Sequence, residues 1–291
     1  MEEVNVTWTP WKVVEGFDFK DIIYEKKHVK ETGGGVSRVT INRPDKMNAF
    51  TQQTSREMVV SFDEASRDPM IGVVVLQGAG DKAFSSGGDV SWEASPGFGL
   101  HFRNPQGGGL KHRSCTKPII AAVRGYCIAG GNHLAYMCDL TLAADNAIFG
   151  QNGPRIGSPA DGFYVAYLTH VVGAKKAREI WMLCRRYSAQ QALEMGLVNA
   201  VVPLAKLDEE VDKWCEEILA LNPDCIEILK ATFDAEVGLL EGIVGSNARW
   251  SVLMHPDFFE GPGVKEAQKA FFEKRKPNFW QFRKPKGQPT R

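Results

Sequence analysis

The sequence predicts an α/β fold, because short apolar runs typical of strands alternate with helix-like segments over its first two thirds. The clearest strand is the continuous apolar run at 71–77, of the kind that is buried on both faces of a parallel sheet. A second run, at 118–123, leads into a glycine-rich turn. After residue 174 the spacing of apolar residues becomes mainly helical. We therefore expect an α/β core followed by a helical C-terminal region.

The remaining elements follow from the same periodicities. Further strands are expected at 22–25, 36–41, 140–144, 143–150 and 198–202. Helices are expected at 51–65, 134–137, 175–183, 188–195, 207–221, 223–239 and within 250–282. We divide the chain into an N-terminal extension at 1–19, a core at 20–205 and a helical region at 206–291. The extension has no clear period and is expected to lie on the surface or on a neighbouring subunit.

Composition excludes several classes of function. The chain has 291 residues, of which 43% are hydrophobic and 24% charged, as in an ordinary globular protein. Since 35 basic residues balance 35 acidic ones, neither nucleic acid nor a membrane surface is an expected partner. No signal peptide and no run of membrane-spanning length is evident, so a cytoplasmic location is expected. Six scattered cysteines form no C-x-x-C pair, and neither a disulfide framework nor a metal site is expected.

Two glycine-rich turns, at 84–89 and 127–132, are the most informative feature. Each follows a strand-like run and leads into helix-like sequence. Glycine lets the main chain approach a ligand closely, because it has no Cβ. Two such turns can direct one backbone N–H each at a single oxygen, which is the construction of an oxyanion hole.

A long irregular segment at 91–111 follows the first turn, and a loop of this length is typically a lid, a binding loop or disordered. Its aromatic content suits a bulky or cyclic acyl group, although mobile surface aromatics explain it equally well. The residues concerned are Trp92, Phe98, His101, Phe102 and His112.

Motifs in a fixed order identify a family. They are the segments 42–49, 84–89, 118–131, 138–139 and 149–151. This order resembles the crotonase (enoyl-CoA hydratase/isomerase) superfamily over about residues 20–285. The resemblance implies a spiral of ββα units, a helical C-terminal trimerisation region, a homotrimer or hexamer, and an acyl-CoA thioester as substrate. It implies no tightly bound cofactor.

The resemblance also assigns residues. It makes Gly88 and Gly130 the catalytic residues whose N–H groups hold the thioester oxygen, where they would stabilise an enolate without a metal. It implies that coenzyme A is held by the segment 42–49, the first glycine turn and a C-terminal lysine. The residues so assigned are Lys46, Asn48, Ala49, Ser86, Gly87, Asp89 and Lys274.

The chain departs from hydratases of this family at their two glutamates. Those positions are occupied by His133 and Gly153, so plain hydration by a pair of carboxylates is disfavoured. His133 could titrate near neutrality and replace one glutamate, or it could be a packed histidine at a helix start.

A narrower branch is indicated by the segments 149–158, 173–181 and 273–279. They resemble dihydroxynaphthoyl-CoA synthases and the hydrolases that open the ring of 2-oxocyclohexane-carboxyl-CoA. In synthases with glycine at the position of Gly153, bound bicarbonate supplies the missing base. Gln151, Gly153 and Trp181 match that anion pocket, unless Gln151 and Trp181 merely pack.

The segment after Ser158 departs from the branch. Relatives have an aspartate and a tyrosine one position earlier than Asp161 and Tyr164, and their C-terminal tyrosine falls on Leu253. Asp161 or Tyr164 could substitute as a proton donor if the loop is rearranged, and Ser158 is a further candidate catalytic residue. Otherwise they only make the loop polar.

Four functions remain. The first is hydrolytic ring opening of an alicyclic β-oxoacyl-CoA, and the second is the ring-forming synthase reaction. The third is an enoyl-CoA hydratase or isomerase that uses His133 and Asp161. The fourth is a CoA-ester-binding protein without catalysis.

Overall fold

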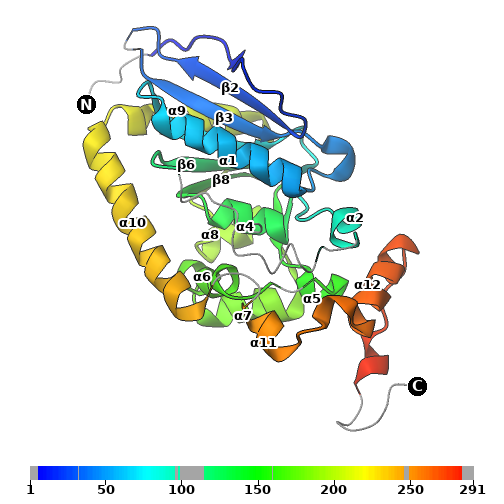
Figure 1. Ribbon diagram of the computed structural model, residues 1–291. Helices are drawn as coiled ribbons and strands as arrows, with labels where there is room; N and C mark the ends of the chain where they lie inside the picture. The colour runs from blue at the N-terminus through cyan, green and yellow to red at the C-terminus, as the bar shows by residue number, and fades with distance from the viewer. Residues whose placement is uncertain are drawn as a thin grey trace.

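The computed structural model describes residues 6–31, 33–95, 98, 115–158, 160–245 and 249–283. It is a mixed α/β structure in which helices cover both faces of a twisted sheet (Figure 1). This confirms the predicted fold class. The expectations for His101, Phe102 and His112 lie outside the described residues.

The larger sheet has the strand order β1-β2-β3-β4-β6-β8-β11. Its strands β1 to β3 pair antiparallel, whereas every pair from β3 to β11 is parallel. The bounds are β1 Lys12–Val13, β2 Ile22–His28, β3 Gly35–Ile41, β4 Ile71–Gly78, β6 Ile119–Val123, β8 Leu140–Ala144 and β11 Ala200–Val202.

The smaller sheet positions the glycine turns. It has the order β10-β9-β7-β5, with β10 Arg186–Ser188, β9 Ile148–Gly150, β7 Tyr126–Ile128 and β5 Ala83–Ser85. Strands β5 and β7 are parallel neighbours, with Ser85 opposite Cys127. Since parallel neighbours end at the same edge of a sheet, the two turns that follow them emerge side by side.

Helices enclose these sheets. Up to residue 183 they are η1 Pro44–Lys46, α1 Gln52–Arg67, α2 Val90–Glu93, α4 Gly130–Tyr136, α5 Gly153–Ile156, α6 Phe163–Val172 and α7 Ala174–Leu183. The later ones are α8 Ala189–Glu194, η3 Leu204–Lys206, α9 Leu207–Leu219, α10 Pro223–Val244, α11 Arg249–Met254, η4 Phe258–Glu260, α12 Pro262–Phe272 and η5 Phe279–Phe282. None of the helices in these described parts is long and apolar enough to cross a membrane.

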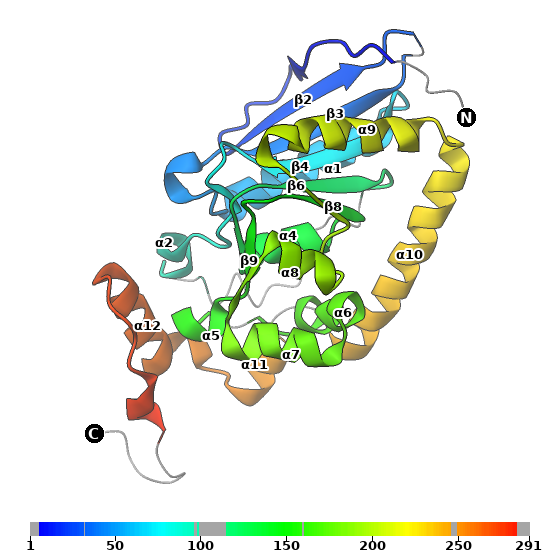
Figure 2. The same ribbon diagram turned by 180° about the vertical axis from the view of Figure 1, so that it is seen from behind.

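Strand β4 shows how the core divides. Its alternate side chains Val74 and Leu76 join the cluster that contains Phe62 of α1, whereas Val73 and Val75 join the cluster that contains Leu207 of α9. Because successive side chains of a strand point to opposite faces, one continuous apolar run fills both clusters. Helices α1 and α9 accordingly lie on opposite faces of the sheet (Figures 1 and 2).

The described part of the N-terminal extension lies on this chain's own sheet. Strand β1 pairs with β2, and the rings of Trp8 and Trp11 lie 4.3 and 4.7 Å from the ammonium of Lys27. Lys27 is only 3% exposed and forms an ion pair with Asp212 of α9 at 2.5 Å. The two indole rings and one carboxylate thus compensate for burying this charge.

Truncating Phe62 tests the packing of α1 on the sheet. Its side chain is 1% exposed, so Phe62→Ala leaves a cavity and we expect a loss of about 3–5 kcal/mol in the free energy of unfolding. Val60 on the same helix is 43% exposed, and Val60→Ala should cost less than about 1 kcal/mol. Denaturant unfolding measures both. Equal losses would contradict the assignment of the buried face.

Candidate active site

The two glycine turns touch. A Cβ on Gly87 would lie 2.9 Å from the backbone nitrogen of Gly130, and a Cβ on Gly131 would lie 2.1 Å from the carbonyl oxygen of Ser85. Gly87 also has a φ of 100°, which side chains rarely adopt. Side chains at these positions would therefore separate the turns.

This contact leaves two amides available. The N–H of Phe50 donates to the oxygen of Gly87, and the N–H of Asp89 donates to the oxygen of Phe50, both at 2.9 Å. The Gly88 N–H lies between these bonds and donates to no acceptor in the described residues. Gly130 is the first residue of α4, where a helix leaves its N–H unpaired. The turns therefore present two adjacent N–H donors, as an oxyanion hole requires.

The backbone is strained where α4 begins. Ala129 has φ 53° and ψ −121°, a conformation that is costly for a residue with a side chain. Its N–H donates to the oxygen of Gly150 at 2.9 Å, which holds it in place. The helix expected at 134–137 in fact begins at Gly130, because the second glycine turn forms its first turn.

The loop at 42–49 is bound to the first turn by Asn48. This side chain is 1% exposed and donates to the carbonyl oxygens of Ala79 and Ala83 at 3.0 and 2.7 Å. Its own oxygen accepts from the N–H of Arg43 at 3.1 Å. The amide of Asn48 is thus engaged in holding the loop, and contact of this residue with coenzyme A stays a prediction.

Asp89 has a similar positioning role. One carboxylate oxygen caps α2 by accepting from the N–H of Ser91 at 2.9 Å, and the other accepts from Arg43 at 3.0 Å. Ser86 donates its N–H to the oxygen of Met47 at 3.0 Å, which connects the loop to the turn. These contacts fix the direction of the Gly88 amide.

Three other predicted coenzyme A contacts lie in different surroundings. Ala49 is buried and its oxygen accepts from Arg43, whereas Lys46 in η1 is exposed. Lys274 is exposed after α12, with a φ of 53°. Contact of these residues with coenzyme A stays a prediction.

His133 is enclosed by aromatic rings. Its imidazole stacks on Tyr164 at 5.5 Å and lies 5.4 Å from Trp181 and 5.6 Å from Tyr136. Burial lowers the pKa of His133 to about 4, and the nearby Gln151 side chain acts in the opposite direction. The expectation that His133 titrates near neutrality is therefore wrong, since the imidazole is neutral at pH 7.

Polar atoms without partners gather around His133. Gln151 is fully buried, and both of its amide atoms, the Nε1 of Trp181 and the Nε2 of His133 have no hydrogen-bond partner in the described residues. Gly153 closes the group, because a Cβ there would lie 3.8 Å from the Trp181 ring. Buried polar groups normally have partners, so this cluster is a candidate binding site for a small polar ligand. We call these four residues the polar pocket.

The segment after the polar pocket contributes less than expected. The carboxylate of Asp161 accepts from the N–H of Ser251 at 2.6 Å, which ties this segment to α11. The backbone oxygen of Tyr164 accepts from the hydroxyl of Tyr136 at 2.7 Å, while its ring covers His133. These contacts give Asp161 and Tyr164 positioning roles, and a proton-transfer role for either stays a prediction.

Glu93 is a site residue that the sequence analysis missed. A Cβ on Gly88 would lie 2.2 Å from the Oε1 of Glu93, so this carboxyl group lies against the oxyanion turn. Burial raises the pKa of Glu93 to about 7, and nearby Asp89 adds to the effect, whereas hydrogen bonding from Ser158 lowers it. Its one sequence signal is its place one helical turn after the capping Asp89.

A large cavity adjoins the polar pocket. It has a volume of about 1030 Å³ and is lined by Gly153, Ser158 and Trp181 on one side. The segment from Met254 to Val264 and η5 line the other side. This space lies beside the predicted anion pocket and can receive an acyl group.

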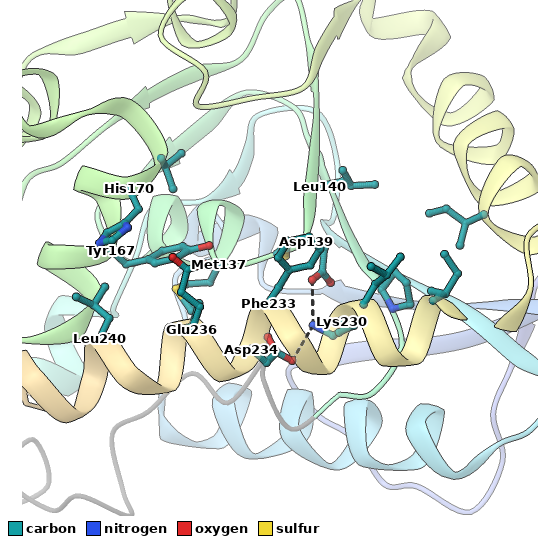
Figure 3. Close-up of a pocket in the computed structure, with 17 residues that line it drawn as sticks. Met137, Asp139, Leu140, Tyr167, His170, Lys230, Phe233, Asp234, Glu236 and Leu240 are labelled. Atoms are coloured by element: carbon teal, nitrogen blue, oxygen red, sulfur yellow. Dashed lines mark hydrogen bonds and ion pairs between the residues drawn. The ribbon is translucent and has the colours of Figure 1, made fainter. Parts of the chain in front are cut away.

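A second cavity, of about 640 Å³, lies between α10 and α6 (Figure 3). Its lysine, Lys230, is already paired with Asp139 at 3.0 Å and Asp234 at 3.3 Å. None of its lining residues belongs to a glycine turn. In the described residues we also find no cluster of three His, Cys, Asp or Glu side chains that could hold a metal. No glycine-turn residue lines the first cavity either, but Gly153 and Trp181 of the polar pocket do, which makes the first cavity the candidate active site.

The pKa of His133 predicts how stability depends on pH. The unfolded chain binds a proton on this histidine below about pH 6.5, whereas the folded chain binds it only near pH 4. The free energy of unfolding should therefore fall as the pH drops from 6.5 to 4, by at most about 1.4 kcal/mol per pH unit from this group. Denaturant unfolding at several pH values should show a smaller decline for His133→Gln. The same decline in both proteins would contradict the neutral, buried imidazole.

Comparisons with known proteins identify chains that are similar in sequence and fold. The family model for enoyl-CoA hydratase/isomerase matches residues 31–283. An enoyl-CoA hydratase from Mycobacterium avium subsp. paratuberculosis K-10 is 29% identical, with a TM-score of 0.71 over 84% of this chain and 94% of that one.

Two further structures are similar. An enoyl-CoA hydratase/carnithine racemase from Magnetospirillum magneticum is 31% identical, with a TM-score of 0.65 over 89% of this chain and 95% of that one. A methylmalonyl-CoA decarboxylase in complex with 2-nitronate-propionyl-CoA shares the fold at 24% identity, with a TM-score of 0.73 over 84% and 94%. The chain belongs to the enoyl-CoA hydratase/isomerase family, the crotonase superfamily.

Proposed function

We propose that this crotonase-superfamily enzyme cleaves a C–C bond of an alicyclic β-oxoacyl-CoA by hydrolysis, through a thioester enolate. The main observation in support of this proposal is that Gly88 and Gly130, in two touching turns, have N–H groups without an acceptor in the described residues. An enolate places negative charge on the thioester oxygen, and preset amide donors stabilise that charge.

The proposed reaction has two chemical stages. A base removes a proton from water as the water oxygen bonds to the β-carbonyl carbon. The bond between the α- and β-carbons then breaks, and its electron pair passes to the enolate held by Gly88 and Gly130. Protonation of the α-carbon completes the ring opening. The same site would catalyse the ring-forming synthase reaction, in which the bond between the α- and β-carbons forms instead of breaking.

The polar pocket supports an anion as the base. Gly153 supplies no carboxylate where a hydratase has a glutamate, and Gln151 and Trp181 have buried polar atoms without partners in the described residues. We propose that Gln151 and Trp181 would hold bicarbonate there, where it would supply a base for the attacking water. His133 contributes a neutral imidazole to the same pocket, because its pKa is about 4.

Hydration or isomerisation of an enoyl-CoA is the second candidate. Glu93 favours it, because this carboxyl group beside Gly88 could serve where His133 and Gly153 do not. Similar structures are also described as enoyl-CoA hydratases. We further propose a homotrimer or hexamer, since α10 exposes Phe233, Leu239 and Ile243 at 61–68%.

Incubation with 2-oxocyclohexane-carboxyl-CoA tests the proposed reaction. Mass spectrometry should show an added water, and Gly88→Pro, which removes the N–H, should lower kcat by about 10²–10³-fold. Gly242→Ala in α10 is the control, because its Cβ would enter open space and the residue lines neither cavity. Circular dichroism verifies folding of each variant. Hydration of a linear enoyl-CoA, with no reaction of the cyclic ester, would replace the first candidate by the second.

Bicarbonate should stimulate the reaction if the polar pocket binds it. Rates in carbonate-free buffer should rise on adding bicarbonate, and Gln151→Ala should abolish the stimulation. Gln190→Ala, which removes an exposed glutamine of α8, should respond like the unmodified protein. A rate indifferent to bicarbonate would remove the anion from the mechanism.

A further inference from the structure

We propose that Glu93 is the acid–base residue that exchanges a proton with the α-carbon of the bound acyl-CoA, an inference that rests on the proposed enolate chemistry. Neither the glycine turns nor the polar pocket supplies a group for this step. The turns present amide donors, and the polar pocket holds a neutral imidazole, an amide and an indole.

The first helical turn of α2 places Glu93 beside the oxyanion turn. Asp89 caps α2, and the N–H of Glu93 donates to the oxygen of Asp89 at 2.9 Å. This single turn returns the chain over Gly88, so that the Oε1 of Glu93 would be 2.2 Å from a Cβ at Gly88. The carboxyl group of Glu93 therefore lies against the residue whose N–H would hold the enolate oxygen. The α-carbon is one bond removed from the thioester carbon.

The surroundings of Glu93 are mainly apolar. A small cavity beside it is lined by Val90, Phe98, Phe259 and Val264, with Ser158 as a hydroxyl neighbour. Within the described parts of the chain, no Lys, Arg or His forms an ion pair with Glu93. Loss of hydration in such a place raises the pKa of the Glu93 carboxyl to about 7, and the nearby Asp89 adds to the effect. Both protonation states are then populated near neutral pH, as an acid–base group requires.

The proton balance of the ring opening is complete with this residue. The protonated carboxyl of Glu93 gives its proton to the α-carbon, while the electron pair of the enolate forms the new C–H bond. The proton that water gave to the base then returns to the Glu93 carboxylate through solvent. One water is consumed, and nothing is oxidised or reduced.

Deuterium exchange isolates this step from ring opening. Cyclohexanecarboxyl-CoA has an α-hydrogen but no β-oxo group, so it cannot be cleaved. In D₂O the unmodified protein should exchange that hydrogen, which mass spectrometry detects as a gain of 1 Da. Glu93→Gln should lower the exchange rate by about 10²–10⁴-fold, the usual contribution of acid–base catalysis. Glu93→Asp should recover part of the rate.

Controls separate this role from binding and folding. Glu217→Gln changes an exposed glutamate of α9 and should exchange at the unmodified rate. The Kd of cyclohexanecarboxyl-CoA, measured by calorimetry, should change less than about threefold in Glu93→Gln. Exchange at the unmodified rate in Glu93→Gln, or no exchange by the unmodified protein, overturns the inference. If the unmodified protein exchanges the α-hydrogen but does not open the ring of 2-oxocyclohexane-carboxyl-CoA, the proposed function is contradicted instead.

Substitution of Ser158 provides a second test, because the pH dependence of exchange would not shift if Glu93 had only a structural role. Exchange needs the carboxylate form, so its rate should rise with pH through the pKa of Glu93. Hydrogen bonding from Ser158 lowers that pKa, and Ser158→Ala should move the rising limb to higher pH. If the exchange rate of Ser158→Ala rises over the same pH range as that of the unmodified protein, Glu93 is not the titrating group.

Discussion

The contact between the two glycine turns is the constraint on which the site depends. Strands β5 and β7 deliver both turns to one edge of the smaller sheet. At that edge the carbonyl of Ser85 faces Gly131, and Gly87 faces the nitrogen of Gly130, at separations that no Cβ could fill. Close backbone contact thus decides that two N–H groups from distant parts of the chain share one location.

A polar network holds this contact in place. The hydroxyl of Ser85 donates to the oxygen of Asn48, and Arg43 donates to Asp89. Several residues that the family resemblance associates with coenzyme A therefore stabilise the turns themselves. Because buried polar networks are costly when partly satisfied, removing one member affects the position of the Gly88 amide as well as stability.

The sequence predicts best what depends on local pattern. Continuous apolar runs located β4 and β6, and glycines located the turns. The state of His133 could not be predicted, because Tyr164 and Trp181, which bury it, are 31 and 48 residues away along the chain. Glu93 was missed for a similar reason, since a lone glutamate in a short helix is usually solvated and only the fold places it against Gly88.

Ser158 connects the two chemically distinct parts of the site. Its carbonyl oxygen would lie 2.5 Å from a Cβ on Gly153, at the polar pocket, while its hydroxyl acts on Glu93. Hydrolysis of a β-oxoacyl thioester needs proton transfer at two separate atoms, water at the β-carbon and the α-carbon itself. The polar pocket, on one side of Ser158, contains no carboxylate. Glu93, on the other side, has a carboxyl group with a pKa of about 7, so the two sides match this division. Hydration of an enoyl-CoA likewise adds water at the β-carbon and a proton at the α-carbon, so this division suits both of the proposed reactions.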